Sequence, residues 1–83
     1  VAVGTNAMLS TTTGGSNIAI GSSAMRLNTT GIENIAFGLN ALYSNTSANY
    51  NTALGYVAMQ DNTTGTQNVA VGRNTLANNT TGD

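Results

Sequence analysis

Four asparagines of this sequence stand where a sugar could be attached. Each begins an N-x-[ST] tripeptide without proline, which is the acceptor for N-linked glycans. The four candidates are Asn28, Asn45, Asn62 and Asn79. They recur every 17 residues, within the stretches NTTG or NTSA. The alternative role is a turn, because Asn and Thr side chains bond to nearby backbone and glycine accepts a positive φ. The two roles are compatible, and the sequence leaves both open.

The threonines of the same stretch offer two further chemistries. Thr29 or Thr30 could carry O-linked glycans in place of the N-linked ones. A regular row of threonines could also form a flat binding face, like that of ice-binding solenoids. Those faces need Thr-x-Thr, whereas neighbouring threonines on an extended strand point to opposite sides. The ice-binding role is therefore the least favoured.

The sequence contains few residues that could catalyse a reaction or bind a metal ion. The chain has no His and no Cys, so nucleophile–His pairs and zinc or haem sites lack their usual ligands. Its carboxylates, Glu33, Asp61 and Asp83, occupy three different places in the repeat. A paired-carboxylate site is not expected from that placement. We expect no enzyme activity, no cofactor and no bound metal.

The chain is a single array of repeats, 17 residues each, as the spacing of its glycines shows. These are Gly4, Gly21, Gly38, Gly55 and Gly72. The repeated unit reads N-Φ-A-Φ-G-x-x-A-[ML]-x-x-N-T-T-G-x-x, where Φ is usually Val, Ile, Leu or Phe. The units span residues 1-16, 17-33, 34-50, 51-67 and 68-83. Because both ends interrupt the repeat, we expect a segment of a longer array.

The first part of the unit predicts a short strand that ends at the glycine. Ile18–Ile20 and Val69–Val71 alternate large, mostly β-branched residues with alanine, a pattern typical of strands. Large side chains lie on one face and alanines on the other, so both faces are apolar. A strand of this kind is normally buried on both sides. The outer face therefore predicts a second copy of the chain as its cover.

The rest of the unit must return the chain to the next strand. We favour a second short strand or extended segment after the glycine, with one helical turn as the alternative. The Met/Leu column is expected to point into the core: Met8, Met25, Leu42, Met59 and Leu76. Seventeen residues are too few for a βαβ unit, which needs about 30. They fit one turn of a parallel β-solenoid, with NTTG as a corner and strands about 4.8 Å apart.

A further column of asparagines is expected to form a ladder of stacked amides between the units. It consists of Asn17, Asn34, Asn51 and Asn68. Such a ladder explains the recurring asparagine without any ligand. The sequence thus predicts an all-β fold, a parallel β-solenoid or β-roll of five coils.

Charge argues against several partners. Only 6% of the residues are charged and the net charge is −1, against about 25% charged in an average soluble protein. Two cationic residues cannot neutralise a phosphate backbone, so nucleic acid is not an expected partner. No apolar run approaches the roughly 18 residues of a membrane span, so we expect no membrane insertion. So neutral a surface requires cover by other chains or by sugars.

The motif N-Φ-A-Φ-G-x-x-A, as in Asn17–Ala24 and Asn68–Gly72, resembles the head repeats of trimeric autotransporter adhesins. The unit here is longer than theirs, with extra residues around NTTG. The full unit is also similar to 17-residue repeats of phage and viral tail-fibre-like proteins and bacterial surface proteins. The resemblance covers the whole chain. It implies a fibrous β-solenoid, trimeric by preference, on a cell surface or virion, without catalytic residues.

Two functions follow as expectations. The favoured one is a structural segment of an extracellular fibre or filament, associating with copies of itself as a trimer or polymeric fibril and carrying covalent glycans. The alternative is an adhesin or tail-fibre module that binds a receptor or glycan. That module would use variable positions such as Tyr43, Tyr50 and Tyr56, because aromatic rings stack on sugars.

Overall fold

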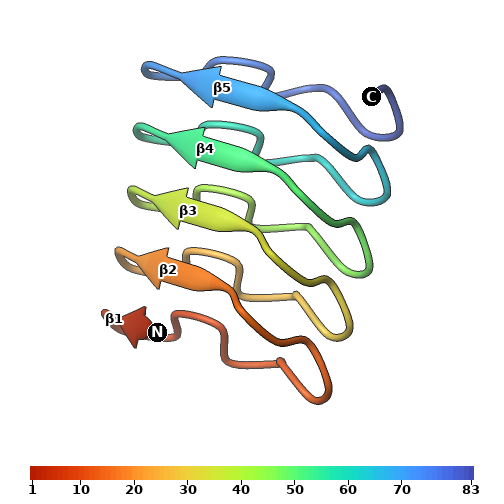
Figure 1. The fold of residues 1–83 in the computed structure, drawn as a ribbon. Helices are drawn as coiled ribbons and strands as arrows, with labels where there is room; N and C mark the ends of the chain where they lie inside the picture. The colour runs from red at the N-terminus through yellow and green to blue at the C-terminus, as the bar shows by residue number, and fades with distance from the viewer.

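The computed structural model describes all residues, 1–83, as one sheet of five short parallel strands without a helix (Figure 1). Each unit contributes one strand. The strands are β1 (Ala2–Val3), β2 (Ile18–Ile20), β3 (Ile35–Phe37), β4 (Thr52–Leu54) and β5 (Val69–Val71). Their order in the sheet is the order in the chain. The predicted all-β class and parallel pairing are confirmed.

The register of the sheet follows the repeat. Ala19 pairs with Ala36, and Ala53 pairs with Ala70, so identical positions of successive units lie opposite each other. After each strand the chain turns back and returns to the start of the next strand (Figure 1). The strand therefore lies on one side of every unit, and the turns and the NTTG corner close the unit on the other sides.

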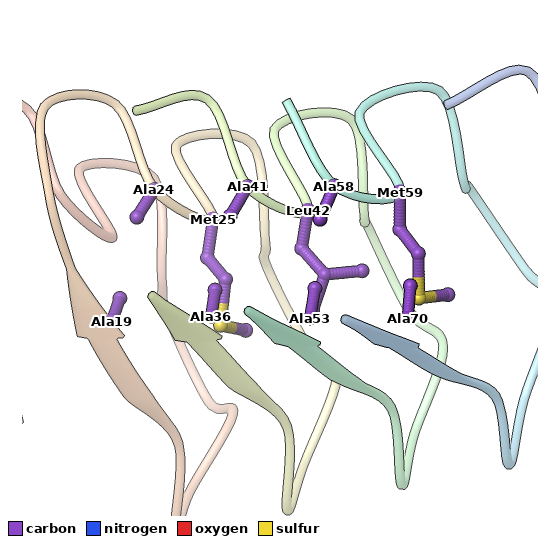
Figure 2. Close-up of a cluster of buried hydrophobic side chains, with 10 residues drawn as sticks. All are labelled: Ala19, Ala24, Met25, Ala36, Ala41, Leu42, Ala53, Ala58, Met59 and Ala70. Carbon is purple, nitrogen blue, oxygen red and sulfur yellow. The ribbon is translucent and has the colours of Figure 1, made fainter. Parts of the chain in front are cut away.

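The core is a thin layer between the sheet and the returning chain. The alanines of strands β2 to β5 point inward, and Ala19, Ala36 and Ala53 are fully buried. Opposite them lie Met25, Leu42 and Met59, also fully buried (Figure 2). The inward orientation of the Met/Leu column is confirmed in the inner units, while Met8 is partly buried and Leu76 is 45% exposed in the end units. Alanine keeps this layer thin, because a larger side chain would hold the two walls apart.

The segment after the strand is a series of tight turns, and the predicted second strand is wrong, as is the helical turn. The amide of Ala24 donates to the carbonyl of Gly21 and that of Arg26 donates to Ser23, both at 3.2 Å. The amides between them bond to the next unit, as Met25 does to Ala41 at 2.9 Å. Alternate residues are left-handed, with φ of 60° at Ser23 and 51° at Met25. This alternation curls the chain while every second amide remains available for stacking.

The glycines of the unit divide their roles differently from the expectation. Positive φ occurs at the glycines that end the strands, such as Gly38 at 140°. Gly31 and Gly65 of NTTG are not among the positive-φ residues. Ala48 replaces glycine at the same position of the third unit, which an ordinary φ permits. The expectation that this glycine supplies a positive φ is therefore wrong.

Candidate functional site

The asparagines of NTTG point into the molecule. Asn28, Asn45 and Asn62 have no exposed surface. The Nδ2 of Asn45 donates to Oδ1 of Asn28 at 2.9 Å and to the carbonyl of Ala48 at 3.2 Å. Asn62 repeats both bonds one unit later, at 3.1 and 3.0 Å. These side chains thus form a direct ladder, amide to amide, through the array.

That ladder bears on whether these asparagines can carry an N-linked glycan. The glycan is attached to Nδ2, and in this ladder Nδ2 is buried and hydrogen-bonded at Asn28, Asn45 and Asn62. A row of N-glycans at these positions does not fit the packing. Asn79 is half-buried in the last unit and its Nδ2 bonds to Asn62. The exposed acceptor is Asn78. It begins an N-x-T tripeptide that overlaps the tripeptide of Asn79. Asn78 lies outside the 17-residue column of candidates, so the repeat did not point to it.

The other asparagine column forms the predicted ladder, mostly through the backbone. Oδ1 of Asn17 accepts the backbone amide of Asn34 at 2.9 Å, and the pattern continues to Asn51 and Asn68 at 3.0 Å each. Nδ2 of Asn34 donates to the carbonyl of Ala48 at 2.8 Å. Asn45 donates to the same carbonyl, so one oxygen joins both ladders. Buried polar groups are satisfied in this way without a ligand.

The first unit lacks a member of the NTTG ladder. Thr11 stands in place of asparagine, and its Oγ1 is buried without a hydrogen-bond partner. In the ladder each Nδ2 donates to the Oδ1 of the preceding unit, so we expect Oδ1 of Thr11→Asn to accept a hydrogen bond from Nδ2 of Asn28 and to stabilise the fold by about 1 kcal/mol, the net value of a typical hydrogen bond. The melting temperature should rise by about 4–8 °C, measured by circular dichroism. Thr13→Asn, at an exposed position, should leave it unchanged, and an equal rise in both would contradict the ladder as the cause.

The two candidate threonines for O-linked sugar differ in their surroundings. The hydroxyl of Thr29 donates to the carbonyl of Thr46 at 3.2 Å and its residue is half-buried. Thr30 is exposed. An added sugar would therefore meet less obstruction at Thr30 than at Thr29.

The carboxylates and tyrosines do not meet at one site. Asp83 accepts the amide of Thr66 at 2.6 Å and its hydroxyl at 3.0 Å. These bonds, the backbone one above all, hold the pKa of the Asp83 carboxyl below its usual value. Glu33 and Asp61 are exposed on other units. No cluster of potential metal ligands is present, the surface has no pocket, and no segment forms a helix that could span a membrane.

Each tyrosine lies at a different position of the unit. The hydroxyl of Tyr43 accepts a hydrogen bond from Arg26 at 2.9 Å. Tyr56 has the Arg73 guanidinium over its ring, 5.3 Å from the centroid. Tyr50 is 49% exposed and lies two residues before strand β4. The three rings therefore offer no common platform for a sugar.

Exposed large apolar side chains gather on the outer face of the sheet. Here "outer face" means the large side chains that flank each strand's alanine and point away from the core. The exposed members are Val1, Val3, Ile18, Ile35, Phe37, Leu54, Val69 and Val71. They are between 38% and 73% exposed, and the half-buried Ile20 and Thr52 complete the row. Contiguous exposed apolar side chains of this kind are typical of surfaces that contact another molecule, so this face can bury apolar area against a second surface.

Comparison of the chain with protein-family models, curated proteins and solved structures finds no match in any of the three.

Proposed function

We propose that this chain is a structural segment of an extracellular fibre or filament, a parallel β-solenoid whose copies associate through the outer face. The observation that carries the proposal is the continuous apolar surface along all five strands. Exposed rows of large apolar side chains mark surfaces that bind another protein. No charged side chain lies within the outer face, so the side chains of two such faces can meet without burying an unpaired charge.

The bonding between units suits a load-bearing role. Each unit joins the next through backbone bonds in both the sheet and the turns, for example Gly38 to Ile20 at 2.8 Å and Leu42 to Ala58 at 3.0 Å. The two asparagine ladders add side-chain bonds in the interior. Units that contact only their neighbours can be repeated to any length. A stiff shaft built from many such units is the structure this arrangement favours.

The remaining parts of the proposal rest on the resemblance and on composition. We place the fibre on a cell surface or virion and favour a trimer, with a polymeric fibril as the other form. Where sugars coat it, exposed positions such as Asn78 and Thr30 are the preferred sites. An adhesin role has no specific observation in its favour, because the tyrosines are dispersed.

The proposal is tested by the association state of the chain in solution. We expect the unmodified chain to form oligomers at micromolar concentration in sedimentation analysis. Phe37→Ser combined with Leu54→Ser should leave monomers, because it removes two apolar side chains that are 53% and 38% exposed. The double variant should have the same circular dichroism spectrum as the unmodified chain.

Leu27→Ser is the matched control, since Leu27 is 36% exposed and lies in the turn segment rather than on the sheet. It should associate like the unmodified chain. A chain that remains monomeric at all concentrations would refute the proposed function. Equal association of the double variant and the Leu27→Ser control would refute the outer face as its surface.

A further inference from the structure

We infer that folding and N-linked glycosylation exclude each other at Asn28, Asn45 and Asn62, and that a glycosyltransferase meeting the folded array attaches its sugar at Asn78. The inference rests on the proposed function in one respect, because an extracellular chain is exported and N-x-[ST] acceptors are used in secreted proteins. The buried ladder makes the order of folding and modification decisive for such a chain.

Both hydrogens of an inner ladder amide are already used in the folded array. Nδ2 of Asn45 donates to Oδ1 of Asn28 at 2.9 Å and to the carbonyl of Ala48 at 3.2 Å. Nδ2 of Asn62 makes the same two bonds, to Asn45 and to Gly65. Transfer of a sugar forms a bond between Nδ2 and C1 of the sugar, breaks the bond from C1 to a diphosphate leaving group, and releases one Nδ2 proton. Each transfer at these positions therefore removes a ladder bond.

A sugar ring also has no space beside the ladder. Successive units stack about 4.8 Å apart, and the asparagine side chains of the three inner NTTG positions have no exposed surface. Close-packed interiors have few voids even as large as a water molecule, and the surface has no pocket that leads inward. A sugar on one of these asparagines would hold its unit away from the neighbouring unit. A chain modified there cannot complete the stack.

The same asparagines are open to modification before the chain folds. The chain contains five N-x-[ST] tripeptides, and none includes proline. Because the acceptor motif is local, an unfolded chain presents all five alike. A glycosyltransferase that acts on the unfolded chain therefore reaches Asn28, Asn45 and Asn62 and prevents the fold.

Asn78 is the acceptor that folding leaves open. Its place in the unit is held by Leu27 and Asp61 in two inner units, and both are exposed. The exposure of Asn78 thus belongs to its place in the unit. Nδ2 of the overlapping acceptor Asn79 bonds to Oδ1 of Asn62 at 3.2 Å. A sugar on Asn78 removes no ladder bond, whereas one on Asn79 does.

Replacement of the third residue of a tripeptide removes the acceptor and keeps the ladder asparagine. These third residues are exposed at all four NTTG positions that begin with asparagine. The four-alanine variant combines Thr30→Ala, Ser47→Ala, Thr64→Ala and Thr81→Ala. It retains the tripeptide of Asn78 as its one acceptor. This variant and the original sequence are compared after each is directed into the secretory pathway of cultured eukaryotic cells.

We expect the original sequence to carry sugar at the inner NTTG asparagines and to remain in the cells in a protease-sensitive form. The four-alanine variant should be secreted in a protease-resistant form, in excess of the original by about tenfold or more, with one glycan on Asn78. Asn78→Gln in that variant should remove the glycan and leave secretion unchanged.

Three results of this comparison would overturn the inference. The first is a folded, secreted chain with sugar on Asn28, Asn45 or Asn62. The second is secretion of the original sequence with those asparagines free of sugar, because the unfolded chain would then not have been modified. The third is equal retention of both chains, because the block would then not depend on the sugar.

The preference for Asn78 is tested on folded chain purified without sugar. A soluble glycosyltransferase that acts on N-x-[ST] with uridine diphosphate glucose should add one glucose, at Asn78. Tryptic cleavage after Arg26 and Arg73 releases residues 74–83, so mass spectrometry separates this site from the three inner ones. Glucose on Asn45 of a chain that keeps its circular dichroism, or no glucose on Asn78, would overturn the inference. Sedimentation of the same samples tests the proposed function separately, since monomeric chains would refute association and leave the exclusion intact.

Discussion

A Gly38→Ala chain is expected to lose about 3–5 kcal/mol of unfolding free energy, the range of the most damaging single substitutions. Gly38 ends strand β3 with a φ of 140°, a conformation that side chains rarely adopt. A Cβ built there would also lie 2.7 Å from the carbonyl carbon of Gly55 in the next unit. Conformational strain and a backbone collision therefore act together. Urea denaturation followed by circular dichroism measures the loss.

The matched control for this substitution is Gly65→Ala. A Cβ at Gly65 would also approach a backbone carbonyl, that of Gly82. The position does not require a positive φ, however, and Ala48 already occupies it one unit earlier. The carbonyl of Ala48 still accepts both asparagine amides, so alanine fits there. Because a Cβ meets a backbone carbonyl at both positions, the two variants differ in φ, and we expect Gly65→Ala to cost about 1–3 kcal/mol less than Gly38→Ala. Similar losses in both variants would contradict the special role of the strand-ending glycine.

The strand and its pairing could be predicted from the sequence, because each residue type in that segment fits only one of the two faces of the sheet. Ile35-Ala36-Phe37 can bury only one of its two faces in so thin a unit. Alanine fits between the sheet and Leu42, while Phe37 does not. The 17-residue spacing then aligns each alanine with the next. Propensity, alternation and period all agree in this segment, which is the condition for a dependable prediction.

The turn segment could not be predicted from the sequence, because its local conformational preferences disagree with the structure that forms. Its left-handed positions are occupied by Ser23, Met25 and their equivalents, for example Leu42 and Val57. A β-branched or bulky side chain disfavours this conformation, so local preference argues against what forms. Stacking overrides it, because the amides freed by the turns bond to the next unit. These hydrogen bonds can be recognised only when the neighbouring units are in place.

The sequence also did not show whether the side chains of the NTTG asparagines point into the core or toward solvent. An N-T-T-G stretch is compatible with an exposed corner or with an inward amide, since both satisfy the same local turn chemistry. The recurrence of Asn28, Asn45 and Asn62 could indicate stacking or a repeated surface motif. The bond from Asn45 to Asn28 decides between them, and it depends on a distance between residues 17 apart.

We expect Asn45→Ala to destabilise the fold by about 3 kcal/mol, because it leaves buried polar groups without partners. The substitution removes the donor to Oδ1 of Asn28 and the acceptor for Nδ2 of Asn62. It also interrupts the ladder in the middle of the array, where both neighbours have no access to water. Thermal and urea unfolding of the purified chain provide the measurement.

Asn45→Asp separates the hydrogen bonds from the volume of the side chain. Aspartate has nearly the shape of asparagine but no amide donor at neutral pH. It would place an acceptor against the oxygens of Asn28 and Ala48, and bury a charge besides. We therefore expect a loss at least as large as that of alanine. A mild effect of aspartate together with a large effect of alanine would indicate that packing volume, and not the ladder, is what the position requires.

Asn78→Ala provides the comparison that separates sequence motif from structure. Asn78 and Asn45 both begin an N-x-[ST] tripeptide, yet Asn78 is exposed and Asn45 has no exposed surface. Substitution of Asn78 should change stability by no more than about 0.5 kcal/mol, as is usual at the surface. A cost confined to Asn45 would mean that stacking alone requires the recurring asparagine. Equal costs would mean that the acceptor tripeptide itself, wherever it lies, contributes to the fold, and the ladder would lose its explanation of the repeat.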